Sequence, residues 1–201
     1  MIRPSIDRGV CRLTGLAAVL SATLLTGCAE LPMGMPRPTI ENAARLRSGT
    51  PAFAAMNVGE FSLDAAQPKG MDRSVNIRSN TVSSPVQDSF AQYLRETLKV
   101  ELQSAGLLDP HSDIVVTGSL LMSSVEAPVG TGKAALSARF VVTRLATVRY
   151  ERVLSVDARW DSPFIGVSAI PQAAGQYESL YRKLVSLLLD DPAFRAAASM
   201  P

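Results

Sequence analysis

Three consecutive stretches between Asp113 and Trp160 alternate apolar and polar residues, and this alternation constrains the fold more than any other feature. The apolar positions of the three stretches are Ile114, Val116, Leu120 and Met122, then Leu136, Ala138, Phe140 and Val142, then Val148, Tyr150, Leu154, Val156, Ala158 and Trp160. A period of two is typical of strands that bury one face. Because the stretches follow one another through short loops, we expect an antiparallel meander with one apolar and one polar face.

The polar face of this predicted sheet carries several arginines. Arg139, Arg149 and Arg159 share it with Glu151 and Asp157. We interpret the three arginines as a possible row that binds a partner protein or anionic lipid, while a solvated sheet face remains the simpler alternative. Arg152 breaks the apolar parity, so we expect it near a sheet edge or bulge. The connecting loops are predicted at residues 126–133 and near residues 145–146.

Two amphipathic helices flank the meander in the sequence. The first is predicted from a cap at Ser84, with Pro85 at its first position, to a stop at Gly106. The second is predicted to start near Pro171 and to end at Asp191. Residues 52–63 read as a strand before the first helix, and residues 75–78 as a short edge strand.

The element order β-α-β-β-β-α predicts an α+β two-layer sandwich: a mixed sheet of about four strands with two helices on one face. We expect the strand at residues 52–63 to run parallel to the first strand of the meander, through a right-handed crossover.

The N-terminus has the three parts of a secretory signal. An arginine-bearing head ends at Arg12, an uncharged apolar run follows from Leu13 to Leu25, and the run leads into Leu25-Thr26-Gly27-Cys28. At about 1.5 Å per residue the run would cover about 20 Å as a helix, which is too short to cross a bilayer. We therefore expect cleavage rather than a membrane span, and an ordinary signal peptide remains the alternative to a lipoprotein signal.

The tetrapeptide Leu25-Thr26-Gly27-Cys28 resembles the bacterial lipobox. The resemblance implies cleavage after Gly27 and lipidation of Cys28, so that Cys11 leaves with the signal and the mature chain has no free thiol. Several acyl chains anchor a protein far more firmly than one. Ala29 follows the cysteine, and in the enterobacterial sorting pattern this implies delivery to the periplasmic face of the outer membrane.

The domain organisation follows from the same signals and from composition. We expect a signal peptide at residues 1–27, a lipidated cysteine with a proline-rich tether at 28–51, one α+β domain at 52–195 and a tail at 196–201. The formal charge of +2 arises entirely within the signal segment, so the mature domain is close to neutral. A neutral domain has no electrostatic footprint for nucleic acid.

Candidate catalytic or ligand-binding groups are few. With one histidine and two cysteines, no metal site built from these residues and no cofactor is predicted. His111 lies between Asp109 and Asp113 and could act as an acid or base, although a solvated turn is the simpler interpretation. Residues 129–134 resemble a phosphate loop only loosely, because Ala127 and Ala134 replace the glycine and the hydroxyl residue that such a loop needs. The adjacent pair Asp190 and Asp191 reads as a solvated helix end.

With the lipobox and this element order, the chain resembles small outer-membrane lipoproteins of Gram-negative bacteria, among them lipopolysaccharide-assembly and lipid-transport auxiliary lipoproteins. The helix that ends in Gly106-Leu107-Leu108 is the part most similar to them. The resemblance implies a non-enzymatic accessory that docks to an outer-membrane or transporter protein; its oligomeric state stays open. An envelope enzyme such as an acyltransferase acting on lipid or glycan is the alternative, although no hexapeptide repeat is visible.

Overall fold

The computed structural model describes residues 30–200, and the predicted signal peptide, Gly27 and Cys28 lie outside this range. The elements in chain order are β1 (Glu30–Pro32), α1 (Ile40–Arg47), β2 (Asn57–Leu63), the 3-10 helix η1 (Lys69–Asp72), β3 (Ser74–Ile77), β4 (Asn80–Ser83), α2 (Phe90–Ala105), β5 (Ile114–Glu126), β6 (Gly130–Arg144), β7 (Thr147–Ser162), α3 (Gly166–Asp190) and α4 (Pro192–Ala197). The predicted α+β class is confirmed. Within residues 30–200, no helix is long and apolar enough to cross a membrane.

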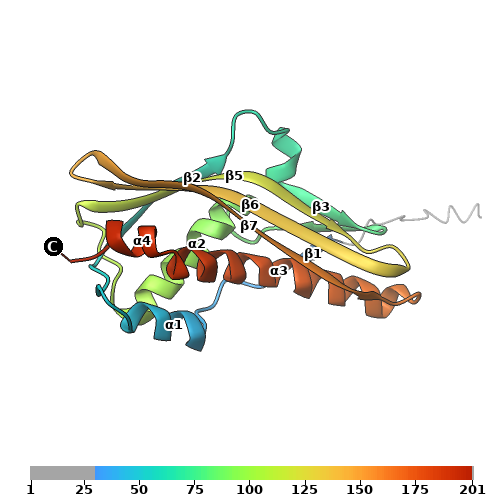
Figure 1. Ribbon diagram of the computed structural model, residues 1–201. Helices are drawn as coiled ribbons and strands as arrows, with labels where there is room; N and C mark the ends of the chain where they lie inside the picture. The colour runs from blue at the N-terminus through green and yellow to red at the C-terminus, as the bar shows by residue number, and fades with distance from the viewer. Residues whose placement is uncertain (1–29, 201) are drawn as a thin grey trace, which may run out of the picture.

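A four-stranded mixed sheet in the order β2-β5-β6-β7 forms one layer, and α2 and α3 lie on one of its faces (Figure 1). β2 pairs with β5 in parallel, as expected for a crossover through α2. β5, β6 and β7 form the predicted antiparallel meander. Its first loop is shorter than predicted, because the strands continue to Glu126 and from Gly130. The predicted tight turn lies at Leu145 and Ala146, which both have positive φ.

Two predicted core positions face outward because β-bulges shift the parity of the strands. The register of β5 against β6 shifts between Leu120 and Met122, and Met122 is 41% exposed. The register of β6 against β7 shifts at Val142 and Thr143, and Val148 is 54% exposed opposite Thr143. A bulge adds one residue to one strand, so every later residue changes face. Arg152 lies on the edge strand β7, as expected.

Both main helices begin at other residues than predicted. α2 starts at Phe90, and the Ser89 hydroxyl accepts a hydrogen bond from Gln92 N (3.1 Å). Gln87 and Asp88 have positive φ, so the chain turns there instead of continuing a helix from Ser84. α2 ends as predicted at Gly106, whose φ of 74° suits a helix stop. α3 starts at Gly166 rather than near Pro171, and the proline lies inside its second turn.

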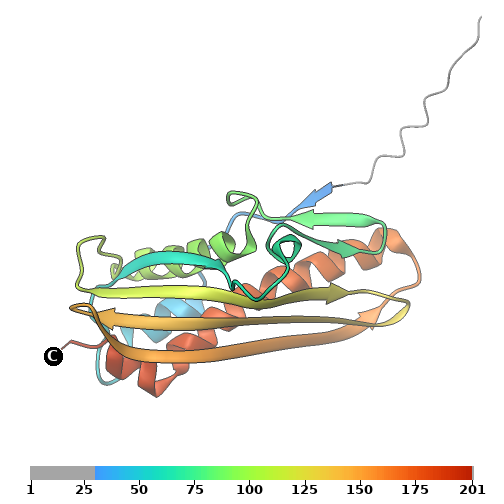
Figure 2. The ribbon, with the colours of Figure 1, turned by 90° about the horizontal axis from the view of Figure 1, so that it is seen from above.

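A second, smaller sheet has the strand order β1-β4-β3 and lies beside one end of the main sheet (Figure 2). The predicted edge strand at residues 75–78 corresponds to β3, which pairs with β4 in a hairpin. β1 joins this hairpin in parallel, with Glu30 opposite Thr81. The chain therefore enters the described structure at the end of the molecule that carries the turn between β3 and β4.

The segment predicted as a flexible tether is part of the fold. After β1, Gly34 N donates to Glu178 Oε2 of α3 (3.1 Å) and Gly34 O accepts from Tyr93 Oη of α2 (2.9 Å). α1 then packs against both α2 and α3. Asn42 and Leu46 are its buried residues, whereas Ile40 is 87% exposed. The proline-rich composition indicated a linker. The contacts that order this segment could not be predicted, because they are made by residues far away in the sequence.

The C-terminal residues pack against the segment that follows α1, although a tail was predicted from residue 196. Phe53 pairs with Ser199 in a β-bridge, and Ala54 N donates to Ala198 O (2.9 Å). Phe194 of α4 is fully buried, and its ring centroid lies 5.8 Å from that of Phe53. The folded unit described by the structure therefore extends from Glu30 to Met200.

Candidate functional site

The candidate site is the face of the main sheet that points away from α2 and α3, which we call the open sheet face. It consists of outward-pointing residues of β5, β6 and β7, among them Thr117, Ser119, Lys133, Ala135, Arg139, Val141, Glu151, Val153, Ser155, Asp157 and Arg159. The intervening residues of β6, such as Leu136 and Phe140, are fully buried beneath the helices. The alternation therefore produces the predicted polar face, with aliphatic side chains among its charges.

Arg139 lies at the centre of the open sheet face. Its neighbours across the sheet are Ser119 on β5 and Val153 on β7. Its Nε lies 3.7 Å from Glu151 Oε1, and both side chains are about half exposed. An ion pair this exposed contributes about 0–1 kcal/mol, so both groups can exchange it for contacts with a partner.

Arg159 lies nearer the loop between β5 and β6. It is opposite Lys133, whose Nζ is 3.0 Å from Glu126 Oε2. These three residues and Asp157 help to line a hollow of about 400 Å³. Two positive and two negative side chains balance there, so the hollow has no strong preference for an anion.

Arg149 is placed apart from the other two arginines. It lies at the bulge where β7 shifts against β6, and it lines a shallow cavity of about 590 Å³ with Arg144, Leu145 and alanines of α4. The cavity is at the opposite end of the sheet from Arg159. The predicted row is therefore interrupted at Arg149 by the same bulge that exposes Val148.

The spacing of the arginines decides what they could bind together. Arg159 is six residues along β7 from Val153, the neighbour of Arg139, which corresponds to about 20 Å. Such a distance is too long for one phosphate or lipid headgroup to contact both guanidinium groups. The arrangement suits an extended surface, such as that of a protein partner, better than a single small anion.

The other sequence candidates for chemistry lie in turns and at helix ends. His111 is exposed, and its backbone N donates to Asp109 Oδ1 (2.9 Å), as the turn interpretation predicted. The neighbouring hydroxyl of Ser112 donates to Ala55 O (2.8 Å). Residues 130–134 are part of β6, so the loose phosphate-loop pattern corresponds to a strand. No group of three His, Cys, Asp or Glu side chains between Glu30 and Met200 is arranged to hold a metal ion.

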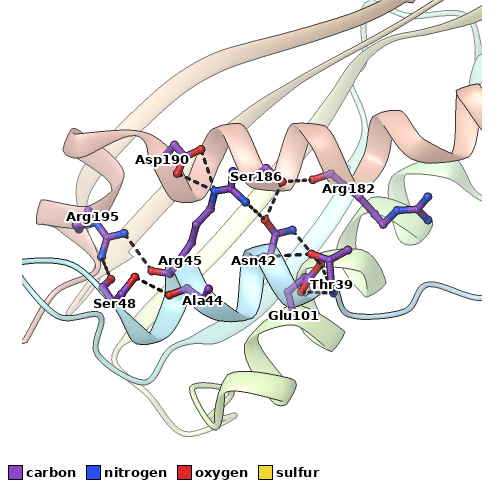
Figure 3. Close-up of polar contacts among 10 residues, drawn as sticks. All are labelled: Thr39, Asn42, Ala44, Arg45, Ser48, Glu101, Arg182, Ser186, Asp190 and Arg195. Carbon is purple, nitrogen blue, oxygen red and sulfur yellow. Dashed lines mark hydrogen bonds and ion pairs between the residues drawn. The ribbon is translucent and has the colours of Figure 1, made fainter.

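A buried polar cluster, which the sequence did not suggest, fixes α1 to the two main helices (Figure 3). Glu101 of α2 is fully buried and accepts from the backbone N of Thr39 (3.0 Å), from Thr39 Oγ1 (3.1 Å) and from Asn42 Nδ2 (2.9 Å). Asn42 Oδ1 accepts in turn from Ser186 Oγ of α3 (2.7 Å). A carboxylate at a helix N-terminus also interacts favourably with the helix dipole. The cluster therefore has a structural role.

Outside this cluster, one ion pair and several hydrogen bonds continue the contact between α1 and the C-terminal elements. Arg45 Nε lies 2.9 Å from Asp190 Oδ1, and Arg195 donates to the carbonyl oxygens of Arg45 (3.2 Å) and Ser48 (3.1 Å). Asp190 and Asp191 were predicted as a solvated pair, but they differ in exposure. Asp190 is exposed and pairs with Arg45, whereas Asp191 is buried.

Asp191 joins the edge strand β7 to α4. Its carboxylate accepts from Tyr150 Oη (2.9 Å) and Arg152 Nη1 (2.9 Å), and its Oδ1 caps α4 at Ala193 N (2.8 Å). Burial alone would raise the pKa of Asp191, but the hydrogen bonds from Tyr150 and Ala193 and the charge of Arg152 together hold the pKa below its usual value. Tyr150 and Arg152 thereby acquire fixed positions, which keeps this edge of the sheet in place.

One exposed apolar group was missed by the sequence analysis. Val129, Phe164, Ile165 and Val167 are between 60% and 81% exposed, and we call them the end patch. They belong to the loop between β5 and β6 and to the connection from β7 into α3, including its first turn. The signal that could have indicated them is the apolar run Pro163-Phe164-Ile165, which lies outside any predicted element.

The comparisons with known proteins show the fold. No family model matches the chain, and no curated protein matches it. The chain is similar to the crystal structure of a Xanthomonas campestris protein described under the family model DUF330, with a TM-score of 0.55, 10% identity, and coverage of 80% of this chain and 92% of that one. A structure of a minor lipoprotein from Acinetobacter baumannii also matches, with a TM-score of 0.40, 11% identity, and coverage of 71% and 91%.

Proposed function

We propose that the protein is a membrane-anchored envelope lipoprotein and acts as a non-enzymatic docking subunit for outer-membrane assembly or lipid transport. The observation that carries the proposal is the open sheet face, which extends along β5, β6 and β7 on the side of the sheet opposite α2 and α3. Aliphatic side chains such as Val153 and Met122 are exposed there beside the charged ones. This mixture of apolar and charged groups is typical of non-obligate protein interfaces.

The lipobox-like segment supports the membrane anchor. Cys28 precedes Glu30, the first residue of β1, by two positions, so a lipid on its sulfur would hold the folded domain within about 7 Å of chain length from the bilayer. A docking protein held this close keeps its surface near the membrane. The geometry thus fits a partner that is itself in the membrane, which we propose to be an outer-membrane or transporter protein on the periplasmic side.

The arrangement of charges supports a protein rather than a small ligand as the partner. Arg139 and Arg159 are far apart on the open sheet face, and each has an acidic neighbour that a partner's own acidic groups could replace. Electrostatic complementarity of this kind sets specificity and association rate more than affinity. A partner with two acidic patches about 20 Å apart would match it.

The test is in-cell crosslinking of the lipidated protein with a photoreactive residue at Val153, followed by mass spectrometry of the products. We expect one envelope protein in stoichiometric yield, and loss of the product when Arg139 and Arg159 are both changed to Glu. The matched control is Lys183→Glu, because Lys183 is exposed on α3, on the helix side of the sheet. Equal yields from both variants, or crosslinks to bulk lipoproteins only, would contradict docking through this face.

A second arm separates docking from enzymatic activity. His111→Ala removes the one imidazole of the chain, and the turn that holds it depends on Asp109 and Ser112 instead. A docking subunit with this substitution should complement a deletion strain fully. Loss of complementation with an intact fold would favour the envelope enzyme.

A further inference from the structure

We propose that the end patch, formed by Val129, Phe164, Ile165 and Val167, inserts into the lipid bilayer beside the acyl anchor and fixes the orientation of the domain. This inference rests on the proposed function, because it takes Cys28 to be lipidated. A lipid anchor alone would limit the distance of the domain from the bilayer but would not fix its orientation, which the end patch would. The occupant of the patch is a bilayer surface rather than a protein.

The first step in the argument is the exposure of these residues. Phe164 is 79% exposed, Ile165 62%, Val167 81% and Val129 60%. Single exposed apolar residues are common, but four at one end of a domain together expose a large amount of apolar area to water. Loops and helix starts with large apolar side chains are well suited to the headgroup and acyl boundary of a bilayer.

The second step is that one arginine holds the loops of the end patch together. Arg78, in the turn between β3 and β4, donates from Nε to Ala127 O (2.9 Å) and from Nη1 to Phe164 O (3.0 Å). It also donates from Nη2 to Pro163 O. Because a single guanidinium spans both connections, Phe164 and the loop that carries Val129 keep a fixed relative position. The β6 and β7 register, with Gly130 opposite Ser162, brings the same two loops side by side.

The third step places the anchor at the same end. Arg78 precedes β4 by two residues, and Thr81 of β4 is opposite Glu30 of β1. Figure 2 shows the chain entering next to β4, toward the end of the molecule that also carries the connection from β7 to α3 and the loop between β5 and β6. Cys28 lies two residues before Glu30, so covalent geometry alone keeps it within about 7 Å of chain length of that strand. The anchor and the end patch therefore face the same bilayer.

The charges near the end patch allow this contact. Arg78 is engaged by three backbone carbonyl oxygens, and Lys133 is paired with Glu126 at 3.0 Å. No side chain of the end patch itself carries a charge. Insertion of these four side chains would therefore bury apolar surface and no charged group of the patch.

The test uses the full lipidated chain with one nitroxide label in vesicles of phosphatidylethanolamine and phosphatidylglycerol at a ratio of about three to one. Phe164→Cys or Val167→Cys supplies the label site, because Cys11 leaves with the signal and the thiol of Cys28 is blocked by lipid. The matched control is Leu145→Cys: Leu145 is 72% exposed in the turn between β6 and β7. This turn is about 45–50 Å from the end patch along β6.

We expect power saturation to show the labels at positions 164 and 167 more accessible to oxygen than to a water-soluble nickel complex by tenfold or more, as for lipid-exposed sites. The label at 145 should show the reverse. A water-like label at 164 on a chain that floats with the vesicles would overturn the inference and leave the anchor intact. Spin–spin broadening at 164 would also overturn it, because the patch would then meet a second copy.

Mass spectrometry of the Cys28 peptide separates the two proposals. An acylated peptide together with a lipid-buried label supports both. An unmodified cysteine with no flotation overturns both the anchor and the orientation argument. The Phe164→Asp variant provides a further check: flotation should persist, whereas the label at 167 should lose its oxygen preference. A full preference at 167 in that variant would contradict insertion through Phe164.

Discussion

Asn42 donates from Nδ2 to Glu101 Oε1 at 2.9 Å, and both side chains are fully buried where α1 meets α2. Glu101 also accepts from the backbone and side chain of Thr39, the N-cap of α1. A buried carboxylate is costly unless hydrogen bonds replace its hydration. This carboxylate is satisfied almost entirely by α1, so the helix and its acceptor depend on each other.

Substitution of Glu101 by Gln is expected to lower the free energy of unfolding by about 2–3 kcal/mol, because an amide group would face the donors of Thr39. Urea unfolding of the mature chain at neutral pH measures this change. Glu96→Gln is the control: Glu96 lies on the same helix, is partly exposed and pairs with Lys99 at 3.2 Å. The Glu96→Gln substitution should lower the free energy of unfolding by less than about 0.5 kcal/mol. Equal costs would contradict the proposed role of the buried carboxylate.

Acid should weaken the contact between β7 and α4. The pKa of Asp191 is lower in the folded than in the unfolded protein, so its contribution is present above the unfolded value of about 4 and is lost as the pH falls through the folded value. Asp191→Asn should therefore reduce stability at pH 7 by about 1–3 kcal/mol. The difference in the free energy of unfolding between the variant and the natural chain should become smaller below about pH 4. Urea midpoints across this pH range provide the measurement, and a constant difference would contradict the prediction.

Alkaline pH should unfold the protein before its tyrosines ionise. All four tyrosines are buried, and burial raises the pKa of Tyr93, Tyr150, Tyr177 and Tyr181 above the ordinary value. Their contribution to stability is complete below the unfolded pKa of about 10 and falls above it, because only the unfolded chain releases these protons. Phenolate absorbance should rise in one step, together with the loss of circular dichroism. A gradual rise from a chain that stays folded would be the opposite result.

Gly132 should tolerate no side chain, because the indole of Trp160 lies across it. A Cβ at Gly132 would overlap with the Trp160 ring at Cε2, and the two residues are opposite each other on β6 and β7. Gly132→Ala is expected to cost about 1–3 kcal/mol and to shift the emission of the single tryptophan. Gly175→Ala is the control, since no atom would lie within 4 Å of the new Cβ on α3. That change should stabilise by up to about 1 kcal/mol.

The meander and its polar face could be predicted because alternation along one strand is a local signal. Leu136, Phe140 and Leu154 are buried as expected. The bulges could not be predicted, because the extra residue in β5 or β7 shows only when the partner strand is known. This is the physical reason why Met122 and Val148 face outward and why Arg149 leaves the row with Arg139 and Arg159.

The prediction of a tether in the N-terminal segment was wrong for a related reason. Its prolines and glycines are typical of a linker, yet Gly34 is bound by Glu178 and Tyr93, and α1 by Glu101 and Ser186. All of these partners follow at least 59 residues later in the chain. The candidate site was predicted in part: the arginine-bearing face exists, whereas the end patch requires loops that only the three-dimensional fold brings together.

The bridge between Phe53 and Ser199 also determines when the protein can reach its native state. A nascent chain carries Phe53 and Ala54 without these partners until Ala198 and Ser199 have been made. α1 and the residues up to Ala54 can complete their packing only after α3 and α4 have been made. Contacts this distant in sequence favour slow folding over stepwise folding from the N-terminus.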